Sequence, residues 1–253
     1  MIINWYIFFF GMCIGSFLNV CIYRVPNGKS IVRPASACPA CGIPIHWYDN
    51  IPVISYIILR GRCRGCKTPI SIRYPIVELL CGLFAVTSCM RFGYSLSALV
   101  YFIFIAALLV ITFIDIDHRI ILDIISLPGI PLGFLASLIL PQLKWSDSLI
   151  GIGAGGGILL AIAWGYQLFT GKDGMGGGDI KLLAMIGAFL GWKGVLFTVM
   201  ASSLIGTAVG IVLMLRAGKG MKMALPFGPF LAIGAIVYLF FGTQLIDLYF
   251  NLL

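Results

Sequence analysis

The sequence has very little charge. Only 10% of its 253 residues are charged, whereas about 25% of the residues in a soluble globular domain are. This deficit excludes a soluble domain, and any acid inside an apolar stretch then needs a functional reason. No Lys or Arg precedes Arg24, and no small-residue cleavage site follows the first apolar run. We therefore expect this run to stay in place as a helix and not to be a removable signal peptide.

Hydrophobic residues stand where charge is missing. They make up 60% of the chain, and the mean hydropathy is +1.06, which predicts an integral membrane protein. A bilayer-spanning helix needs about 20 apolar residues. Runs of about this length occur at 1–23, 74–90 (interrupted only by Glu78), 92–114, 124–143, 148–171, 194–215 and 223–246. A further run, 182–192, is short.

The distribution of positive charge decides whether the short run 182–192 crosses the membrane. With eight crossings and the N-terminus outside, 14 of the 17 basic residues lie inside, and only Arg91, Lys144 and Lys193 lie outside. Without that crossing the split is 12 to 5, so the positive-inside rule favours eight transmembrane helices in an all-α polytopic protein. A helix from Asp179 to Trp192 then covers about 21 Å of a hydrocarbon core about 30 Å thick. Either Asp179 lies below the membrane surface or the bilayer is thinner there.

This topology divides the chain into three regions. We expect a first transmembrane helix at 1–23, a cytoplasmic extramembrane segment at 24–73 and a transmembrane bundle of about seven helices at 74–253. The net charge of +8 does not indicate nucleic-acid binding, because most basic residues lie in loops where they set the orientation of the helices. The lipid bilayer is the partner that the composition predicts.

Four of the eight cysteines form two CxxC pairs in the segment 24–73. They are Cys38, Cys41, Cys63 and Cys66, with 21 residues between the pairs. Each pair can place two thiolates on one knuckle for tetrahedral Zn²⁺, and metal binding would supply folding energy to a segment with little apolar core. We predict a structural zinc site. A redox dithiol pair is an alternative, although no βαβ pattern surrounds it, and His46 is an alternative ligand.

The remaining four cysteines lie inside apolar runs. We predict that they are small buried side chains: Cys13, Cys21, Cys81 and Cys89.

Two glycine-containing motifs have structural interpretations. Residues 151–156, Gly-Ile-Gly-Ala-Gly-Gly, match G-x-G-x-x-G literally, but no strand precedes them. We interpret them as a site of close helix packing and not of nucleotide binding. Pro226-Phe227-Gly228-Pro229 opens the last apolar run, and its two prolines fix where that helix begins. Lining of a functional site is the alternative for this second motif.

Acids gather at the predicted inner ends of three helices. Asp115, Asp117 and Asp123 follow one apolar run, and Asp179 follows a glycine-rich stretch before another. Two carboxyl groups a few ångströms apart hold one proton between them. One can then take a proton from water while the other polarises a peptide carbonyl. We predict that Asp179 forms such a pair with one of the other acids.

Helical periodicity leaves the partner of Asp179 open. If the helix continues past residue 114, Asp115 and Asp117 point about 200° apart, so only one faces the bundle interior. Asp115 is closer to the apolar run and is favoured, with a plain ion pair to Arg119 as the alternative. Asp173 is interpreted as a solvated loop acid. The glycines around Asp179 are interpreted as clearance for an extended peptide.

In this order, the motifs resemble those of the bacterial type IV prepilin peptidases, also called leader peptidase/N-methyltransferases, which are GxGD-type membrane aspartic proteases. The resemblance covers nearly the whole chain. It is carried by Gly15-Ser16-Phe17-Leu18-Asn19-Val20 with Tyr23-Arg24, the two CxxC pairs with Trp47-Tyr48-Asp49-Asn50-Ile51-Pro52 between them, Arg73-Tyr74-Pro75 leading to Glu78, Ile114-Asp115-Ile116-Asp117, Gly176-Gly177-Gly178-Asp179-Ile180-Lys181-Leu182, and Pro226-Phe227-Gly228-Pro229. Leu122 is a departure, since many members have proline there.

The resemblance implies a bifunctional enzyme of the bacterial inner membrane with a periplasmic N-terminus. Such an enzyme cuts the basic leader of type IV prepilins or type II secretion pseudopilins after a glycine, on the cytoplasmic side. Asp115 and Asp179 match the family's catalytic pair. The enzyme then methylates the new N-terminal residue with S-adenosylmethionine. The sequence has no convincing motif for this methyl donor, and the zinc-bearing segment is where we expect methyl transfer.

Two other classes of function are compatible with parts of the sequence. A proton-coupled transporter also places acids and glycine-broken helices in a membrane, but it would need acids near the midplane and repeated helices. A zinc-anchored scaffold would depend on the four cysteines and not on the two acids.

Overall fold

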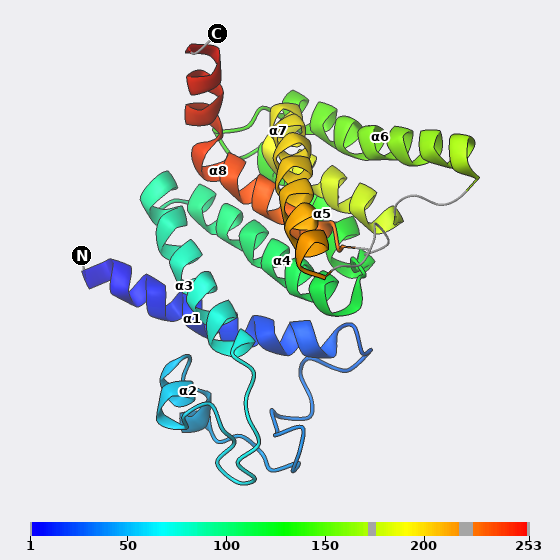
Figure 1. Cartoon of the computed structure of the whole chain (residues 1–253). Coiled ribbons are helices and arrows are strands. Elements are labelled where there is room, and N and C mark those ends of the chain that lie inside the picture. Colours follow the sequence, from blue (N-terminus) through cyan, green and yellow to red (C-terminus); the bar gives the residue numbers. More distant parts are fainter. Residues whose placement is uncertain (1, 172–175, 218–224, 252–253) are drawn as a thin grey trace. The chain divides into compact units, whose positions relative to one another are not determined.

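The computed structural model describes residues 2–171, 176–217 and 225–251, and over these residues the fold is all-helical (Figure 1). Its α-helices are α1 (Ile2–Arg24), α2 (Ile54–Ile58), α3 (Arg73–Phe92), α4 (Leu96–His118), α5 (Asp123–Ser137), α6 (Trp145–Thr170), α7 (Gly177–Ala217) and α8 (Gly228–Asn251), and one 3-10 turn, η1, covers Trp47–Asn50. The predicted all-α class is confirmed.

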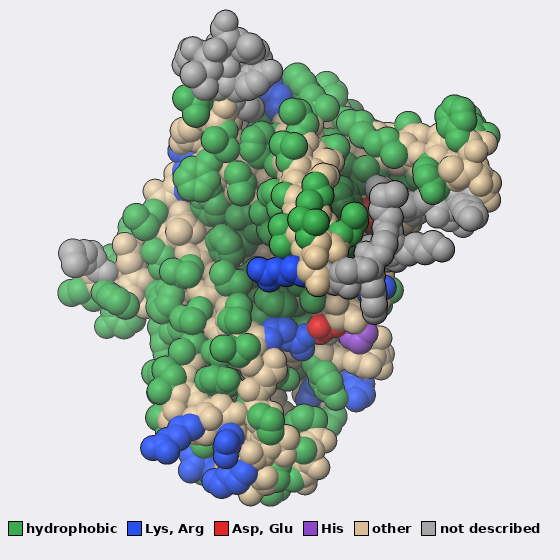
Figure 2. Space-filling model, viewed as in Figure 1, with side chains coloured by type: hydrophobic (Ala, Val, Ile, Leu, Met, Phe, Trp, Pro, Cys, Tyr) green, Lys and Arg blue, Asp and Glu red, His purple; other side chains and the backbone are tan. Residues whose placement is uncertain are grey.

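The helices form where the apolar runs were found. Within the described residues, α1, α3, α4, α6 and α7 are long and apolar enough to cross a membrane, while α5 and α8 contain shorter apolar helices. Large hydrophobic side chains remain exposed along them, such as Phe10, Leu83 and Phe169. Hydrophobic side chains cover the helices in Figure 2, whereas Lys and Arg side chains gather over the segment between α1 and α3. This pattern suits helices surrounded by lipid.

Helix α7 contains a break. Gly191 has φ 72° and ψ 178°, which are not helical angles, and glycine adopts a positive φ at little cost. The break separates a short helical stretch that begins at Gly177 from a longer one that ends at Ala217. The predicted runs 182–192 and 194–215 correspond to these stretches, and the predicted boundary at Trp192 lies one residue past the break.

The chain folds as two compact units, Met1–Val110 and Ile111–Leu253, and α4 runs through the boundary. In the first unit α1 packs along α3. A Cβ atom on Gly15 would lie only 2.7 Å from the Glu78 Cα, so the two backbones touch at this point. The Asn19 side chain, buried near the end of α1, donates a hydrogen bond of 3.1 Å to the Tyr74 carbonyl. The assignment of separate roles to 1–23, 24–73 and 74–253 stays a prediction.

In the second unit α7 packs against α5, α6 and α8. The literal G-x-G-x-x-G sequence lies within α6, and two of its glycines, Gly151 and Gly155, contact the backbone of α7 so closely that a Cβ would collide with the Gly187 and Leu183 carbonyls. Gly153, on another face, has nothing within 4 Å of its ideal Cβ position. The helix-packing interpretation of this motif is therefore confirmed.

The predicted burial of the four cysteines in apolar runs holds only in part. Cys81 is buried on α3, whereas Cys21 and Cys89 are half-buried. The prediction is wrong for Cys13, which is exposed because it lies on a face of α1 that α3 does not cover.

Candidate active site and metal centre

Asp115 lies in the last turn of α4 with only 5% of its surface exposed. Its Oδ2 accepts a hydrogen bond of 3.0 Å from the Gly228 backbone N–H, at the first residue of α8. A Cβ atom on Gly228 would lie 2.7 Å from that same oxygen. The helix start therefore approaches the carboxyl group more closely than any residue with a side chain allows.

The ion pair between Asp115 and Arg119 that the sequence left open does not form. Arg119 donates its backbone N–H to the Asp115 carbonyl at 2.9 Å. Its φ of 56° then turns the chain out of the helix, and its side chain is exposed. Asp117 is also exposed, so Asp115 is the acid of this stretch that faces inward.

Asp179 is the third residue of α7 and is half-buried. It lies close enough to Asp115 for the two carboxyl charges to interact. Ile121 packs between the start of α7 and the start of α8. An ideal Cβ atom on Gly178 would lie 2.8 Å from the Ile121 Cβ, and one on Gly228 would lie 3.3 Å from the Ile121 Cδ1. The ends of α4, α7 and α8 thus converge on one place.

Asp123 lies apart from this pair. Asp123 begins α5 and forms an exposed ion pair of 2.8 Å with Lys181, which links the start of α5 to the second turn of α7. Asp173 lies outside the described residues.

The electrostatics of the pair are balanced by helix ends. Asp115 faces the N-terminus of α8, and Asp179 lies in the first turn of α7. Helix N-termini stabilise negative charge, whereas burial and the nearness of a second carboxyl oppose it. In general, two carboxyl groups that share a proton can serve as acid and base.

Sequence reasoning gave Gly228 a structural role in starting a helix, with lining of a site only as the alternative. The structure supports that alternative, because the Gly228 N–H holds Asp115. The signal available in the sequence was a glycine between two prolines at the start of a helix, where backbone N–H groups are free to bind an anion.

The four cysteines of the two CxxC pairs come together in the first unit. All four Sγ atoms lie within 4.8 Å of one another, and those of Cys38 and Cys66 are 3.7 Å apart. Tetrahedral zinc thiolates, with Zn–S of about 2.3 Å, place sulfurs about 3.8 Å apart. None of the four forms a disulfide. The donor set and its spacing therefore fit a bound metal ion.

Each pair is built by the same local turn. In the first knuckle Cys38 N–H donates to the Ile43 carbonyl at 3.0 Å, and in the second Cys63 N–H donates to the Thr68 carbonyl at 2.9 Å. The sequence already carries this likeness, since residues 38–45 and 63–70 both follow the pattern C-x-x-C-x-x-P-I. This repeat is a sequence signal for two matched knuckles.

The thiols of the cluster differ in acidity. Hydrogen bonds from the Thr68 hydroxyl and backbone lower the pKa of Cys66 to about 6. The Ile43 backbone N–H acts to lower the pKa of Cys41, but desolvation and the neighbouring thiols outweigh it and raise this pKa to about 11. Four crowded thiols cannot all ionise unless a cation joins them, and a divalent metal supplies that charge.

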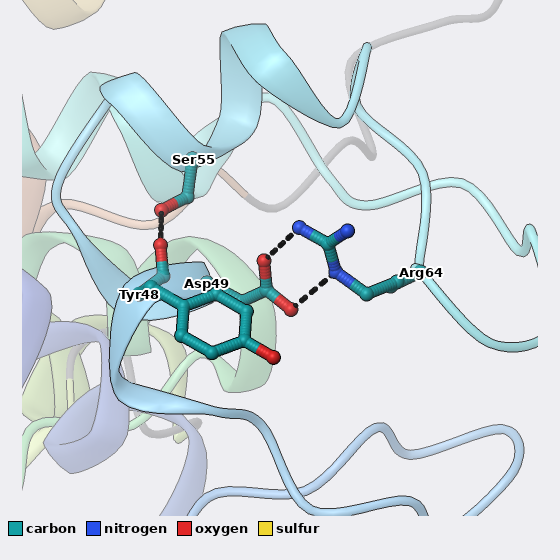
Figure 3. A network of polar contacts seen from close by, with 4 residues as sticks. All are labelled: Tyr48, Asp49, Ser55 and Arg64. Atoms are coloured by element: carbon teal, nitrogen blue, oxygen red, sulfur yellow. Dashed lines mark hydrogen bonds and ion pairs between the residues drawn. The ribbon is translucent and has the colours of Figure 1, made fainter.

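A polar network beside the second knuckle fixes its position (Figure 3). Arg64, between the two cysteines of that knuckle, donates to both carboxylate oxygens of Asp49 at 2.6 and 2.8 Å, and these hydrogen bonds lower the pKa of Asp49. Ser55 donates to the Tyr48 carbonyl at 3.0 Å. His46, the alternative ligand, stacks on the Tyr48 ring with centroids 5.2 Å apart. It is not part of the metal-binding group found among the described residues.

Two family models match the chain. The bacterial peptidase A24 N-terminal domain matches residues 9–92, and the type IV leader peptidase family matches residues 102–211. Three prepilin leader peptidase/N-methyltransferases are similar over nearly their whole length. That of Aeromonas hydrophila is 38% identical over 94% of this chain and 91% of its own, that of Pseudomonas putida 37% over 93% and 89%, and that of Pseudomonas aeruginosa 36% over 94% and 90%. No solved structure matches the chain.

The long apolar helices and the A24 match make this chain a multi-pass membrane protein of the peptidase A24 class. Within that class, it belongs to the prepilin leader peptidase/N-methyltransferase family.

Proposed function

We propose that the protein is a membrane-embedded aspartic endopeptidase that cuts the leader from type IV prepilins or type II secretion pseudopilins after a glycine. It then methylates the new N-terminal residue with S-adenosylmethionine. The observation that carries the peptidase assignment is the convergence of Asp115 and Asp179 at the ends of three helices. The names of the similar proteins support the substrate and the second activity.

The peptidase step uses the shared proton of the two acids. The ionised carboxyl takes a proton from a water molecule, which attacks the scissile carbonyl while the protonated carboxyl donates a hydrogen bond to the carbonyl oxygen. The hydrogen bond from Gly228 N–H favours the charged form of Asp115. We therefore assign the base to Asp115 and the acid to Asp179.

The position of the scissile bond in the substrate indicates on which side of the membrane the two acids lie. A prepilin enters the bilayer as an apolar helix whose basic leader stays in the cytoplasm, so its scissile bond lies at the inner interface. In the topology that we propose, eight helices cross the membrane and α7 crosses twice. The break at Gly191 is compatible with this division of α7. By the positive-inside rule, Asp115 and Asp179 then lie at that interface and the N-terminus lies in the periplasm.

We propose two cofactors, a structural zinc ion and the methyl donor. Cys38, Cys41, Cys63 and Cys66 hold a structural Zn²⁺, which fixes the segment 24–73. S-adenosylmethionine supplies the methyl group as a co-substrate, and we place methyl transfer in the unit that contains this segment.

Cleavage of a purified prepilin, followed by its change in size, tests the peptidase assignment. Asp115→Asn and Asp179→Asn should each lower the rate at least about 1,000-fold, because the changed side chain can no longer supply its half of the proton transfer. Asp147→Asn, a change to a half-buried acid at the start of α6, is the matched control and should cut normally. Wild-type cleavage by either Asn variant of the pair would show that the assignment is wrong.

A further inference from the structure

The first unit contains a buried acid that the peptidase does not use. Glu78, on α3, is the only glutamate in the chain and is 7% exposed. Its Oε2 accepts a hydrogen bond of 2.8 Å from the Val53 backbone N–H, and the Ser16 hydroxyl donates to the same carboxyl group. Both donors are neutral. Among the described residues no Lys or Arg pairs with Glu78.

Strained backbone keeps this carboxyl group in place. Val53 has φ 61° and ψ −46°, angles that a β-branched residue adopts only when its surroundings force it to. On the other side, the Glu78 Cα is in contact with Gly15 of α1. This carboxyl group is held by neutral partners and lacks a countercharge, and burying an unpaired charge is costly.

Only one other acid lies in this unit, and it is already paired. Asp49 binds the Arg64 guanidinium through two hydrogen bonds. The peptidase pair lies in the second unit, in the region that matches the type IV leader peptidase family, whereas Glu78 and the cysteine cluster lie in the region that matches the A24 N-terminal domain. Glu78 is thus the available buried acid of the unit to which we assign methyl transfer.

We propose that the Glu78 carboxylate binds the free N-terminal ammonium of the cleaved peptide and accepts its proton during methyl transfer. This inference rests on the proposed methyltransferase function. The ammonium gives one proton to Glu78, and the nitrogen lone pair then forms the new N–C bond to the methyl group of the donor. The C–S bond breaks with its electron pair going to sulfur, so the sulfonium becomes a neutral thioether.

A pre-cleaved peptide with a free N-terminus separates this inference from peptidase activity. Methylation is followed by mass spectrometry with S-adenosylmethionine present. Glu78→Gln keeps an oxygen that accepts the Val53 N–H but cannot take a proton, and it should lower methylation at least about 100-fold. Glu78→Asp should restore part of the rate. Ser88→Ala, at another buried polar residue of α3, is the control and should change methylation far less.

Binding of the peptide gives a readout that a merely structural role would not change. The wild-type enzyme should bind the free-amine peptide at least about 30-fold more tightly than the same peptide with an acetylated N-terminus. Glu78→Gln should bind both almost equally, with unchanged zinc content and thermal unfolding.

Several results would overturn the inference. Normal methylation by Glu78→Gln would do so, as would a loss of methylation that comes with lost zinc or a lower unfolding temperature. If only the KM for S-adenosylmethionine rises and the preference for the free amine persists, the carboxylate binds a cationic group of the methyl donor instead. A wild-type enzyme that cleaves prepilin but methylates no peptide would refute the methyltransferase half of the proposed function itself.

Discussion

The cysteine cluster and the acid pair are assembled in opposite ways. Each cysteine knuckle is made by a hydrogen bond that spans five residues. The two knuckles of the cluster meet where Cys38 contacts Cys66, which is 28 residues further along the chain. The acid site joins Asp115 to Gly228 across 113 residues, and its geometry exists only after three helices have packed. Local sequence therefore specifies the first site, whereas the tertiary contacts of α4, α7 and α8 specify the second.

The largest expected effect breaks the locally built site. Cys63→Ser should lower bound zinc from about one ion per chain to almost none, because a structural site needs all four thiolates. Elemental analysis of the purified protein measures this. Cys13→Ser changes an exposed cysteine on α1 and should keep the metal. Full zinc occupancy in Cys63→Ser would contradict the four-cysteine site.

The second prediction breaks the site that packing builds. Gly228→Ala adds a methyl group whose ideal position is only 2.7 Å from Oδ2 of Asp115. The carboxyl group must therefore move. A displacement of about 1 Å in a catalytic group costs about 100-fold in rate, and prepilin cleavage should fall by about that factor.

Gly206→Ala is the matched control for this change. The nearest atom to its added Cβ is 3.4 Å away, on the Phe230 ring, which is an ordinary contact distance. Cleavage should stay near the wild-type rate. Equal losses in both variants would mean that the Asp115 contact has no special role.

The third prediction compares two faces of one helix. Gly151→Ala brings a Cβ into the α7 backbone at Gly187 and should destabilise the protein by about 1–3 kcal/mol. Gly153→Ala meets nothing within 4 Å and should stabilise the helix by about 0.5–1 kcal/mol. Thermal unfolding in detergent measures both changes. Shifts of the same sign would refute the assignment of Gly151 to the helix contact.

The smallest effect is expected at the rim of the acid site. Lys181→Met removes the exposed ion pair with Asp123, and such pairs contribute at most about 1 kcal/mol. Unfolding in detergent should change by no more than that, and prepilin cleavage should stay within about threefold of wild type. A loss comparable to that of Gly228→Ala would make Lys181 part of the catalytic machinery.

Most helices and the main residues of both sites could be predicted from the sequence. Apolar runs predicted the helices, and even the short stretch 182–192 was separated from the following helix near the break at Gly191. The four-cysteine cluster could be predicted because CxxC spacing fixes the local turn. Periodicity also gave the correct relation between Asp115 and Asp117, one buried and one exposed.

Contacts between segments that are distant in the sequence could not be predicted from it. Nothing in the spacing of residues places the Gly228 N–H against Asp115, or Ile121 between two helix starts, because both depend on how the helices pack. The exposure of Cys13 was missed for the same reason, since composition does not reveal which face of α1 meets α3. The buried contact of Glu78 with Val53 also depends on tertiary structure.

The most direct test of the central claim is prepilin cleavage by the double variant Asp115→Asn/Asp179→Asn, measured beside the two single variants. Two acids that share one proton act as a unit, so each single change should remove nearly all activity and the double change should remove no more. Equal residual rates in all three variants are the predicted result. Losses that multiply in the double variant, or a single variant that cuts at the wild-type rate, would contradict the pair.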